Sequence, residues 1–545
     1  MTLEPWPTRS IWLWAVLTVG FVGLFLARFP TVSTFDNFLF ADWGANLTVQ
    51  ALLDRGEQPI VDYFYPYGLL PLLLGRFGFG LFEKTPQTYL GFMVLSHVFA
   101  AWGMARLASA LRVGVPGVVF LIVTIPYALP STHPSLSHAL ETVLICHALA
   151  EQARGRRHIA LALATAAVLT KPSMAYVLGL VLLGFIAREL IGRTSDRLRE
   201  GWSQIRPAFL TALGFGVVLA VVFGIRPLIG SILPLQVASL YRDADYGFFF
   251  GTGRRFWLPD NAGVRHYLGT QLGFWLASTV ALIAGGLRVL ALAIRREGRD
   301  ARNESLSHGH VREIVLTCAI LHMSFLCFFF AGEVSWLYYS YLLILGITAL
   351  GGLGAPWPLV VAILATLALV ADRSIPGEVV AAWDGGSFSA DSRGLWTSPE
   401  QQAEWQEVLR RVEGHPTAVL SMAGAAPVLY PDHFLPSVTL FLLPGMEGTI
   451  DTHRMARHIQ SAELVLVPTR SAQGMGVYPF LLGCPELRLA LNAKDPIWKG
   501  SSYAIYRTGE DESRDKDFSP GSICRKDDFE SLDRPEHPSA PSVTP

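Results

Sequence analysis

The sequence predicts an all-α polytopic membrane protein that carries a small α/β domain near its C-terminal end. Of 545 residues, 87 are charged (43 Lys and Arg plus 44 Asp and Glu, 16%), and the mean hydropathy is +0.38. Soluble domains carry about 25% charge. The charges are also uneven, since 39 lie in residues 373–545 and the other 48 in residues 1–372. Residues 1–372 are therefore expected to form a membrane domain, and residues 373–508 an exterior soluble domain.

Eleven apolar segments in residues 1–372 are candidate membrane spans, because a spanning helix takes about 20 apolar residues. Another apolar stretch, residues 67–83, contains Arg76 and either crosses the bilayer or lies in its interface. The eleven candidates are residues 11–29, 88–110, 114–130, 135–152, 158–171, 174–192, 208–232, 268–292, 312–331, 336–353 and 356–372.

Clusters of arginines orient these spans, because cytoplasmic loops are enriched in Lys and Arg. If residues 67–83 do not cross, every cluster falls in the cytoplasm. The chain then has eleven spans, with its N-terminus cytoplasmic and its C-terminus exterior, and loops 30–87 and 233–267 lie outside. The arginines concerned are Arg154, Arg156, Arg157, Arg188, Arg193, Arg197, Arg199, Arg295, Arg296, Arg299 and Arg302, with Arg9 before the first span.

The exterior tail has the pattern of a small α/β domain. Ser398 followed by Pro399 is typical of an N-cap and a first helical residue, and it predicts a helix to about Val412. Short strand-like runs follow at residues 418–420, 464–467 and 503–506.

The end of the chain differs from the rest of the tail. Residues 509–545 are rich in charge, Pro and Ser without periodicity, so they are expected to be disordered. Cys484 and Cys524 both lie in the tail, where an oxidising exterior would permit a disulfide between them. The net charge of −1 gives no reason to expect nucleic acid as a partner.

Residues 38–55, in the first exterior loop, are predicted to form an amphipathic helix. Asp42, Asn46 and Gln50 recur every fourth residue and would form a polar stripe, opposite an apolar face around Trp43. Such a helix is expected to lie flat on the bilayer, which would hold Asp42 at the depth of the lipid headgroups. Taken alone, Asp42 has a simpler interpretation as a solvated loop carboxylate.

Ionisable side chains within or at the edge of spans are functional candidates, because they are costly there. Lys171 comes at the exterior end of two short spans, where Pro172 breaks the helix. The alternative for Lys171 is a lysine that reaches the exterior surface. Glu141 lies just inside the fourth span near His133, and Glu333 lies in a short exterior turn. For both acids the alternative is a structural carboxylate.

The exterior loop 233–267 holds a cluster of arginines that includes Arg254, Arg255 and Arg265. Guanidinium groups suit phosphate, because they donate two parallel hydrogen bonds. This cluster runs against the positive-inside trend, so it indicates a function other than topology.

Three motifs together resemble those of the GT-C glycosyltransferases. They are Asp42 in the first exterior loop, then Gly56-Glu57-x-Pro59 with Asp62-Tyr63, and much later Thr170-Lys171. The most similar branch is that of the protein O-mannosyltransferases and the lipid A aminoarabinose transferases. In layout the likeness covers about residues 11–372. Two positions depart from it, since Trp43 follows Asp42 where many relatives have Glu, and Glu333 stands where relatives often have a basic residue.

The resemblance implies a membrane enzyme that transfers a sugar from a polyprenyl-phosphate donor to a lipid, glycan or protein acceptor on the exterior face. It implies Asp42 as the general base, Lys171 beside the donor phosphate and Glu141 as a second acid. Tyr339 falls in the tyrosine-containing segment that enters a late span in relatives. Asp62, His133 and Glu333 are further candidates for binding the acceptor.

The residue types fit this reaction independently of the likeness. A lipid phosphate is already a good leaving group, so the reaction needs one carboxylate to accept the acceptor's proton and cations to stabilise the departing phosphate. Asp42, Lys171 and the loop arginines would supply this set, with inversion at the anomeric carbon. The two exterior acids, Asp42 and Glu141, leave room for a divalent metal such as Mg²⁺ or Mn²⁺, which the sequence leaves open.

Two other functions stay open, namely a transporter or lipid flippase and a polymerase of cell-envelope polysaccharides. Transporters often show inverted repeats and helices broken at the midplane, whereas this sequence shows no evident repeat and its break at Lys171 is placed at the exterior end. A polymerase would share the large exterior loops and much of the chemistry. No zinc-protease, Walker or dinucleotide-binding motif is present.

Overall fold

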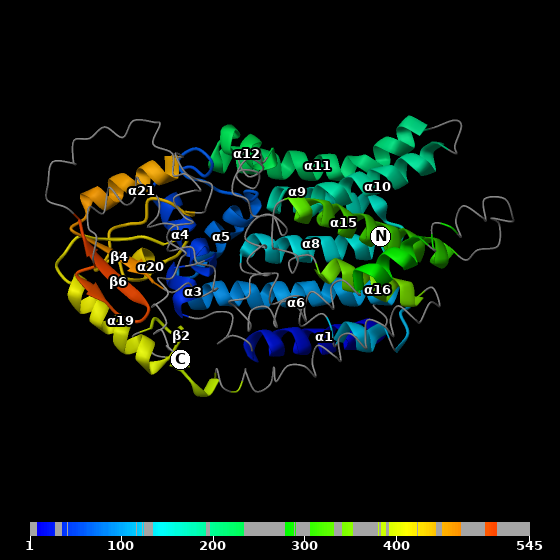
Figure 1. Cartoon of the computed structure of the whole chain (residues 1–545). Helices are drawn as coiled ribbons and strands as arrows, with labels where there is room; N and C mark the ends of the chain where they lie inside the picture. Colours follow the sequence, from blue (N-terminus) through cyan, green and yellow to red (C-terminus); the bar gives the residue numbers. More distant parts are fainter. Residues whose placement is uncertain are drawn as a thin grey trace, which may run out of the picture. The chain divides into compact units, whose positions relative to one another are not determined.

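The computed structural model of the chain is mostly helical, with a small sheet region (Figure 1). It describes residues 8–27, 35–40, 42–115, 117–122, 124, 135–191, 197–233, 278–287, 289, 291, 306–331, 340–352, 380, 383–388, 392–421, 423–442, 450–469 and 496–508. The chain divides into two compact units. The helical unit comprises Met1–Thr31, Pro66–Glu83 and Gln87–Ala382, and the mixed unit comprises Val32–Tyr65, Lys84–Pro86 and Trp383–Pro545. The sequence does not predict that residues 32–65 group with the C-terminal part of the chain.

Three helices are long and apolar enough, by length and composition, to cross a membrane: α6, α10 and residues Arg199–Phe223 of α11. The predicted span 208–232 is interrupted at Gly224, whose φ of +93° ends α11. The principal helices of this part are α1 (Thr8–Ala27), α5 (Leu70–Leu81), α6 (Pro86–Ala110), α8 (Leu136–Ala153), α9 (Arg157–Thr170), α10 (Met174–Ile191), α11 (Arg197–Phe223), α12 (Ile225–Ile232), α15 (Leu306–Ala331) and α16 (Ser340–Gly352).

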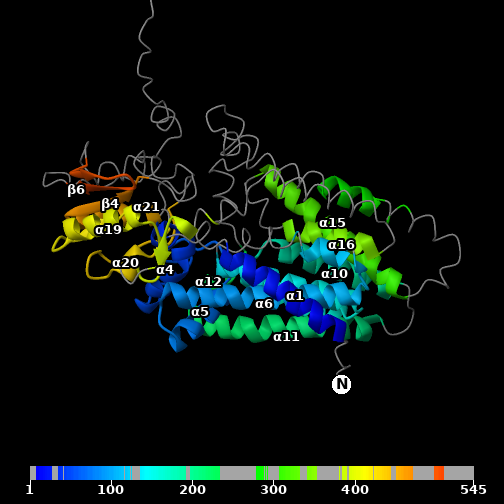
Figure 2. The same ribbon diagram turned by 90° about the horizontal axis from the view of Figure 1, so that it is seen from below.

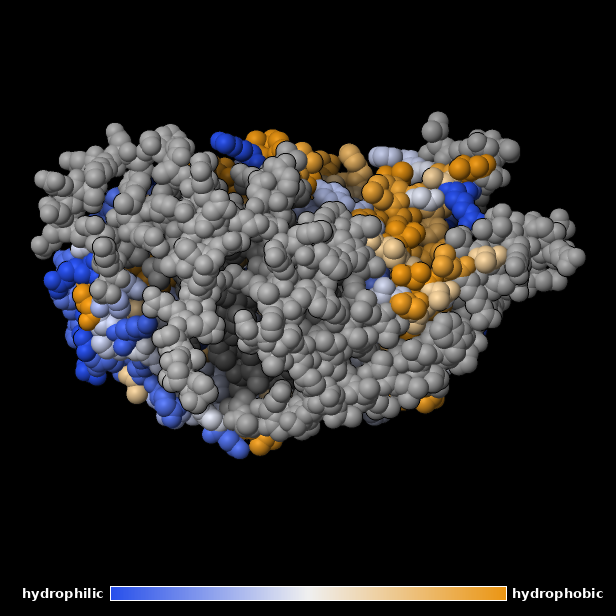
Figure 3. All heavy atoms as spheres, in the orientation of Figure 1, coloured by the Kyte–Doolittle hydropathy of each residue, from blue (hydrophilic) through white to orange (hydrophobic). Residues whose placement is uncertain are grey.

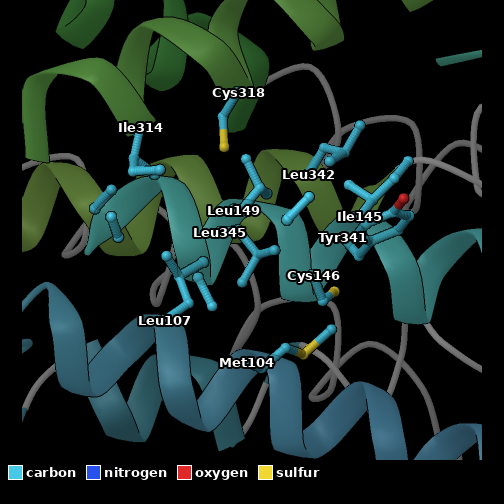
Figure 4. Packing of buried hydrophobic residues seen from close by; sticks show 14 of the residues in the cluster. Met104, Leu107, Ile145, Cys146, Leu149, Ile314, Cys318, Tyr341, Leu342 and Leu345 are labelled. Carbon is cyan, nitrogen blue, oxygen red and sulfur yellow. The ribbon is translucent and has the colours of Figure 1, made fainter. Parts of the chain in front are cut away.

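The core of the helical unit lies between α6, α8, α15 and α16. Figure 4 shows Met104 of α6, Cys146 of α8, Cys318 of α15 and Tyr341 of α16 among the side chains that converge there, and all four are fully buried. Cys146 and Cys318 are free thiols, as expected for cysteines that only pack.

The outward face of α11 is apolar. Phe209, Leu213, Val217 and Val221 are each at least half exposed, and Val221 reaches 81%. Of the described surface visible in Figure 3, the helical unit is mostly hydrophobic and the mixed unit mostly hydrophilic. An exposed apolar helix face of this length suits contact with lipid rather than with water.

The apolar stretch 67–83 forms the short helix α5. Its 12 residues span about 18 Å at 1.5 Å per residue, whereas the hydrocarbon core of a bilayer is about 30 Å thick. By itself α5 is therefore too short to cross the hydrocarbon core.

The sheet of the mixed unit has four strands in the order β3-β4-β6-β5. Figure 2 labels its two longest strands, β4 and β6. β3 and β4 are parallel, and the other neighbours are antiparallel. All three predicted strand runs are confirmed to within one residue at either end. The strands are β3 (Thr417–Val419), β4 (Leu464–Pro468), β5 (Trp498–Lys499) and β6 (Tyr503–Arg507), and β1 (Ser387–Phe388) pairs separately with β2 (Trp396–Thr397).

Helices α19, α20 and α21 complete the C-terminal part of the mixed unit. The predicted helix after Ser398 is confirmed as α19, and the Ser398 hydroxyl accepts a hydrogen bond of 3.1 Å from the backbone N–H of Gln401. The bounds are α19 (Pro399–Val412), α20 (Ala426–Leu429) and α21 (Ile450–Ser461).

The predicted amphipathic helix is present as α3 (Phe35–Phe40) and α4 (Asp42–Asp54), but its surroundings differ from the prediction. Trp43 is 2% exposed and Gln50, expected on a polar surface stripe, is 3% exposed. The backbone N–H of Ala425 donates to the carbonyl of Phe38 (2.9 Å), and the Thr48 hydroxyl donates to the carbonyl of Gly424. The helix is therefore covered by the C-terminal segment of the chain, and the prediction of an apolar face lying on lipid was wrong.

Candidate functional site

The junction between α9 and α10 brings Lys171 next to α8. α9 ends at Thr170, Lys171 continues with an extended backbone (φ −152°, ψ 108°), and α10 begins at Met174. Pro172 explains the break, because a residue before proline avoids the helical conformation. The helix break predicted at Lys171 and Pro172 is confirmed.

Two side chains of α8 meet the ammonium group of Lys171. Its Nζ lies 2.5 Å from Nε2 of His138 and 3.9 Å from Oε2 of Glu141. Oε1 of Glu141 accepts a hydrogen bond of 2.7 Å from the hydroxyl of Ser173. The side chain of Glu141 is only 2% exposed and that of Lys171 15%. We call Lys171, His138, Glu141 and Ser173 the lysine cluster.

Ser135 lies beside the imidazole of this cluster. It is the N-cap of α8, and its Oγ accepts from the backbone N–H of His138 and lies 2.8 Å from Nδ1 of the ring. An ammonium group has no lone pair, so Lys171 donates to Nε2 and the ring proton is on Nδ1, directed at Ser135. His138 is then neutral, and the single positive charge of Lys171 faces the single negative charge of Glu141.

Residues 67 and 68 form one wall of the lysine cluster. The ring of Tyr67 meets that of His138 edge to face, with centroids 5.6 Å apart. The backbone N–H of Gly68 donates to the carbonyl of Thr170 (3.0 Å). A Cβ atom at Gly68 would lie 2.1 Å from the carbonyl oxygen of Leu169. Only glycine permits this approach, which holds the end of α9 and hence the backbone of Lys171.

The opposite ends of α8 and α9 carry a separate group of charges. Glu151 is 3% exposed and pairs with Arg106, while Arg157 pairs with Glu313 at 2.6 Å and with Glu189 at 2.5 Å. Arg157 begins α9 and Lys171 follows its last residue, so the 14-residue helix separates the two groups by about 21 Å. The lysine cluster and this second group of charges are therefore separate sites at the two ends of α9.

Of the predicted site residues, the structure brings Lys171 and Glu141 together. Asp42 is the first residue of α4 in the mixed unit, and only its backbone is described. The remaining predicted positions, except for Asp62, lie outside the described residues, namely Arg254, Arg255, Arg265, His133, Glu333 and Tyr339.

Asp62 lies in a turn of the mixed unit. Its Oδ2 accepts a hydrogen bond of 2.6 Å from the backbone N–H of Gln58, and its carbonyl accepts from Arg454. Arg454 also pairs with Glu57 at 2.5 Å. These contacts give Asp62 a role in holding residues 57–62 against α21.

A divalent metal at Glu141 does not fit its surroundings. Both carboxylate oxygens already face donors, one the hydroxyl of Ser173 and the other the ammonium of Lys171. A nearby positive charge opposes the binding of a cation. Within the described part of the chain, no group of three or more His, Cys, Asp or Glu side chains could hold a metal ion.

Sequence reasoning did not assign a role in this site to His138, Ser135, Ser173 or Tyr67. One signal was present for His138, because it precedes Glu141 by three residues and residues three apart share a helix face. Ser135 stands three residues before His138, at the spacing of an N-cap and the backbone N–H that it accepts from. No signal in the sequence relates Tyr67 to α8.

The chain has no recognisable relative in the comparisons with known proteins. No protein-family model matches it, no curated protein is significantly similar to it, and no solved structure matches it. Its function is therefore argued from the chemistry of the site.

Proposed function

We propose that the chain is an integral membrane glycosyltransferase that moves a sugar from a polyprenyl-phosphate donor to an acceptor on the exterior face. In this proposal the membrane part is GT-C-like with about eleven spans, and the mixed unit is exterior. The observation that carries the proposal is the lysine cluster, in which a nearly buried ammonium group stands at the broken junction of two apolar helices. Ionisable groups are retained in such places when they have a function.

The lysine cluster suits a phosphate that gains charge as it leaves. Lys171 has three N–H donors; His138 takes one and Glu141 faces another at the long distance of 3.9 Å. A departing phosphate that reaches the cluster would be attracted by the charge of this ammonium group. Because Glu141 balances the resting charge, the attraction for phosphate would be greatest when the leaving group becomes most negative, which favours the transition state over the bound donor.

The proposed reaction moves one proton and one pair of electrons. Asp42 accepts the proton of the acceptor hydroxyl, whose oxygen forms a bond to the anomeric carbon from the side opposite the phosphate. The bond between that carbon and the phosphate oxygen breaks, and its electron pair stays on the phosphate, stabilised by Lys171 and by arginines of loop 233–267. The configuration at the anomeric carbon inverts.

A transporter or flippase is the second candidate, and the same ion pair supports it. A buried Lys–Glu pair at a helix break also occurs where protons or ions are coupled to transport. The Lys171–Glu141 pair would then change partners during transport, whereas in the glycosyltransferase it stays fixed and the donor bond breaks.

One assay separates these candidates. Purified full-length protein in nanodiscs is incubated with a series of labelled polyprenyl-phosphate sugars, and release or transfer of the sugar is measured. Wild-type protein should turn over one of these donors, and Asp42→Asn should not. Asp54→Asn is the control, because Asp54 ends the same helix and pairs with Lys84 near the surface. Full activity of Asp42→Asn, or donor movement across vesicles without bond cleavage, would overturn the proposal.

A further inference from the structure

A narrow pocket opens in the mixed unit at the carboxyl end of β3. Its empty volume is about 320 Å³, including the solvent at its mouth. Val419 ends β3, and the loop that follows contributes Ser421 and Gly424. In sheets with parallel strands, ligands bind in the crevice beyond the carboxyl ends of those strands. The other lining residues are Pro427, Ser437, Thr439, Leu440, Met455 and His458.

Four of the lining residues present polar groups to this pocket without a hydrogen-bond partner. Among the described residues, neither the hydroxyls of Ser421, Ser437 and Thr439 nor the imidazole of His458 makes a side-chain hydrogen bond to the protein. Thr439 is only 7% exposed. These hydroxyls and the imidazole can therefore bond a molecule that enters the pocket.

Two guanidinium groups act on His458 at the pocket. Burial, and then the charges of Arg55 and Arg454, lower the pKa of His458 to about 4. The two guanidinium groups share one carboxylate, Glu57, at 2.8 and 2.5 Å. Arg55 also donates to the carbonyl of Ser437, which fixes its charge beside the pocket. An anion placed next to His458 would therefore be attracted.

We propose that this pocket binds a phosphate-type oxyanion through the hydroxyls of Ser421, Ser437 and Thr439 and the imidazole of His458. Hydroxyl and imidazole N–H groups can donate to an oxyanion, and Arg55 and Arg454 supply the charge. The described lining holds no carboxylate, carboxamide, Phe, Tyr or Trp side chain, the groups that most often accept from sugar hydroxyls or stack on a sugar ring. The oxyanion is either free phosphate or the phosphate of a lipid headgroup. The inference is independent of glycosyl transfer.

Calorimetric titration of the full-length protein in neutral detergent with inorganic phosphate tests the pocket. Phosphate should bind to the wild-type protein. Ser421→Ala and Thr439→Val should each raise the Kd for phosphate by about tenfold, because a hydrogen bond to a charged group is lost. Ser461→Ala is the control on α21, since the Ser461 hydroxyl bonds the carbonyl of His458 and does not line the pocket. The same titration is repeated with short-chain phosphatidylglycerol. If only this lipid binds, the oxyanion is the phosphate of a lipid headgroup.

A chemical footprint on the wild-type protein tests the pocket without any variant. Phosphate or short-chain phosphatidylglycerol, but not the same concentration of chloride, should slow the modification of His458 by diethyl pyrocarbonate at least severalfold. His415 is the internal control, since its side chain is 48% exposed and pairs with Glu463 outside the pocket. If neither compound binds, if the two variants bind like wild type, or if His458 and His415 are protected alike, the proposal is wrong.

Discussion

Lys171 shows how one residue is defined by its neighbours. The sequence indicates an ionisable side chain at a helix break, and that prediction needs only residues 168–173. It leaves open whether the lysine reaches the surface or lies in a buried site, because these two interpretations differ only in what lies beside Nζ. The contacts with His138 and Glu141, at 2.5 and 3.9 Å, favour the buried site over a lysine that reaches into solvent. Those partners come from 33 and 30 positions earlier in the chain, where no local pattern relates them to Lys171.

Lys171 and Glu141 should be coupled in stability. Removal of one partner from a buried ion pair leaves the other charge uncompensated and costs about 3–5 kcal/mol, more than the pair itself contributes. Lys171→Met should lower the free energy of unfolding by that order, and Lys171→Met combined with Glu141→Gln should lower it less than the sum of the two single changes. A double-mutant cycle measured by unfolding in detergent gives the coupling. Additive effects would show that the pair is not a unit.

Asp451 should make the stability of the mixed unit depend on pH. It is 1% exposed, and burial raises its pKa from 3.8 to about 7, against the hydrogen bond from the backbone N–H of Phe64 (2.9 Å) and the charge of Arg454, which lower it. The folded chain binds this proton more tightly than the unfolded chain does. The stabilisation from Asp451 is therefore complete below pH 3.8 and is lost as the pH rises through about 7.

The comparison of wild type with Asp451→Asn isolates this effect. Asparagine keeps an acceptor for Phe64 but does not titrate, so the stability difference between the two proteins should change by roughly 4 kcal/mol between pH 4 and pH 8. The difference is needed because His458, whose pKa is lowered to about 4, contributes stability with the opposite pH dependence. Thermal unfolding across this range measures it, and a difference that stays constant with pH would refute the assignment.

Helix α4 shows what periodicity predicts about an element and what it does not. The spacing of Asp42, Asn46 and Gln50 correctly indicates a helix, because it depends on local geometry alone. It does not indicate what the apolar face packs against, since contact with protein and contact with lipid both favour the same amphipathic pattern. The loop around Gly424, far along the chain, covers the helix. By contrast the start of α19 was predictable, because its Ser398 cap and its Pro399 are local signals.

Gly44 should be intolerant of any side chain, because α4 approaches other backbone there. A Cβ atom would lie 1.8 Å from the carbonyl oxygen of Phe38 and 2.6 Å from the nitrogen of Ala425. Gly44→Ala should therefore destabilise the mixed unit by about 1–3 kcal/mol and reduce transfer, because the helix that begins at Asp42 must shift. Thermal unfolding and the transfer assay measure both effects.

Gly214 provides the matched control in another helix. A Cβ atom there meets nothing within 4 Å, so Gly214→Ala should leave stability unchanged or raise it by up to about 1 kcal/mol through helix propensity. Equal effects of the two substitutions would mean that the close approach at Gly44 contributes nothing.

At the scale of the whole molecule, the mixed unit is assembled from two distant parts of the sequence. The ring of Trp405, in α19, contacts Phe35 and Phe40 from the N-terminal part at centroid distances of 5.4 and 5.8 Å, and Tyr503 of β6 at 5.4 Å. Tyr503 in turn donates a hydrogen bond of 2.5 Å to Asp36. Sequence reasoning assigned these parts to separate regions, because composition distinguishes membrane from soluble segments but does not pair one soluble segment with another.

Trp405→Ala should therefore loosen both parts of the mixed unit at once. Loss of a buried tryptophan costs about 3–5 kcal/mol, and the ring is 1% exposed. Limited proteolysis should produce new cuts within residues 35–65 and within residues 399–508 at the same protease concentration. Trp202→Ala, at a tryptophan 53% exposed on α11, should produce neither. New cuts confined to the C-terminal part would contradict a single unit.

The measurement that tests the central claim most directly is donor turnover by a variant of the lysine cluster. With full-length protein in nanodiscs and the labelled polyprenyl-phosphate sugar that wild type consumes, Lys171→Gln should lower kcat by about 10²–10³-fold, as expected when a donor to a developing negative charge is removed. Lys84→Gln, at a partly exposed lysine that pairs with Asp54, should match wild type. A Lys171→Gln protein with wild-type kcat would contradict the assignment of the lysine cluster to the reaction.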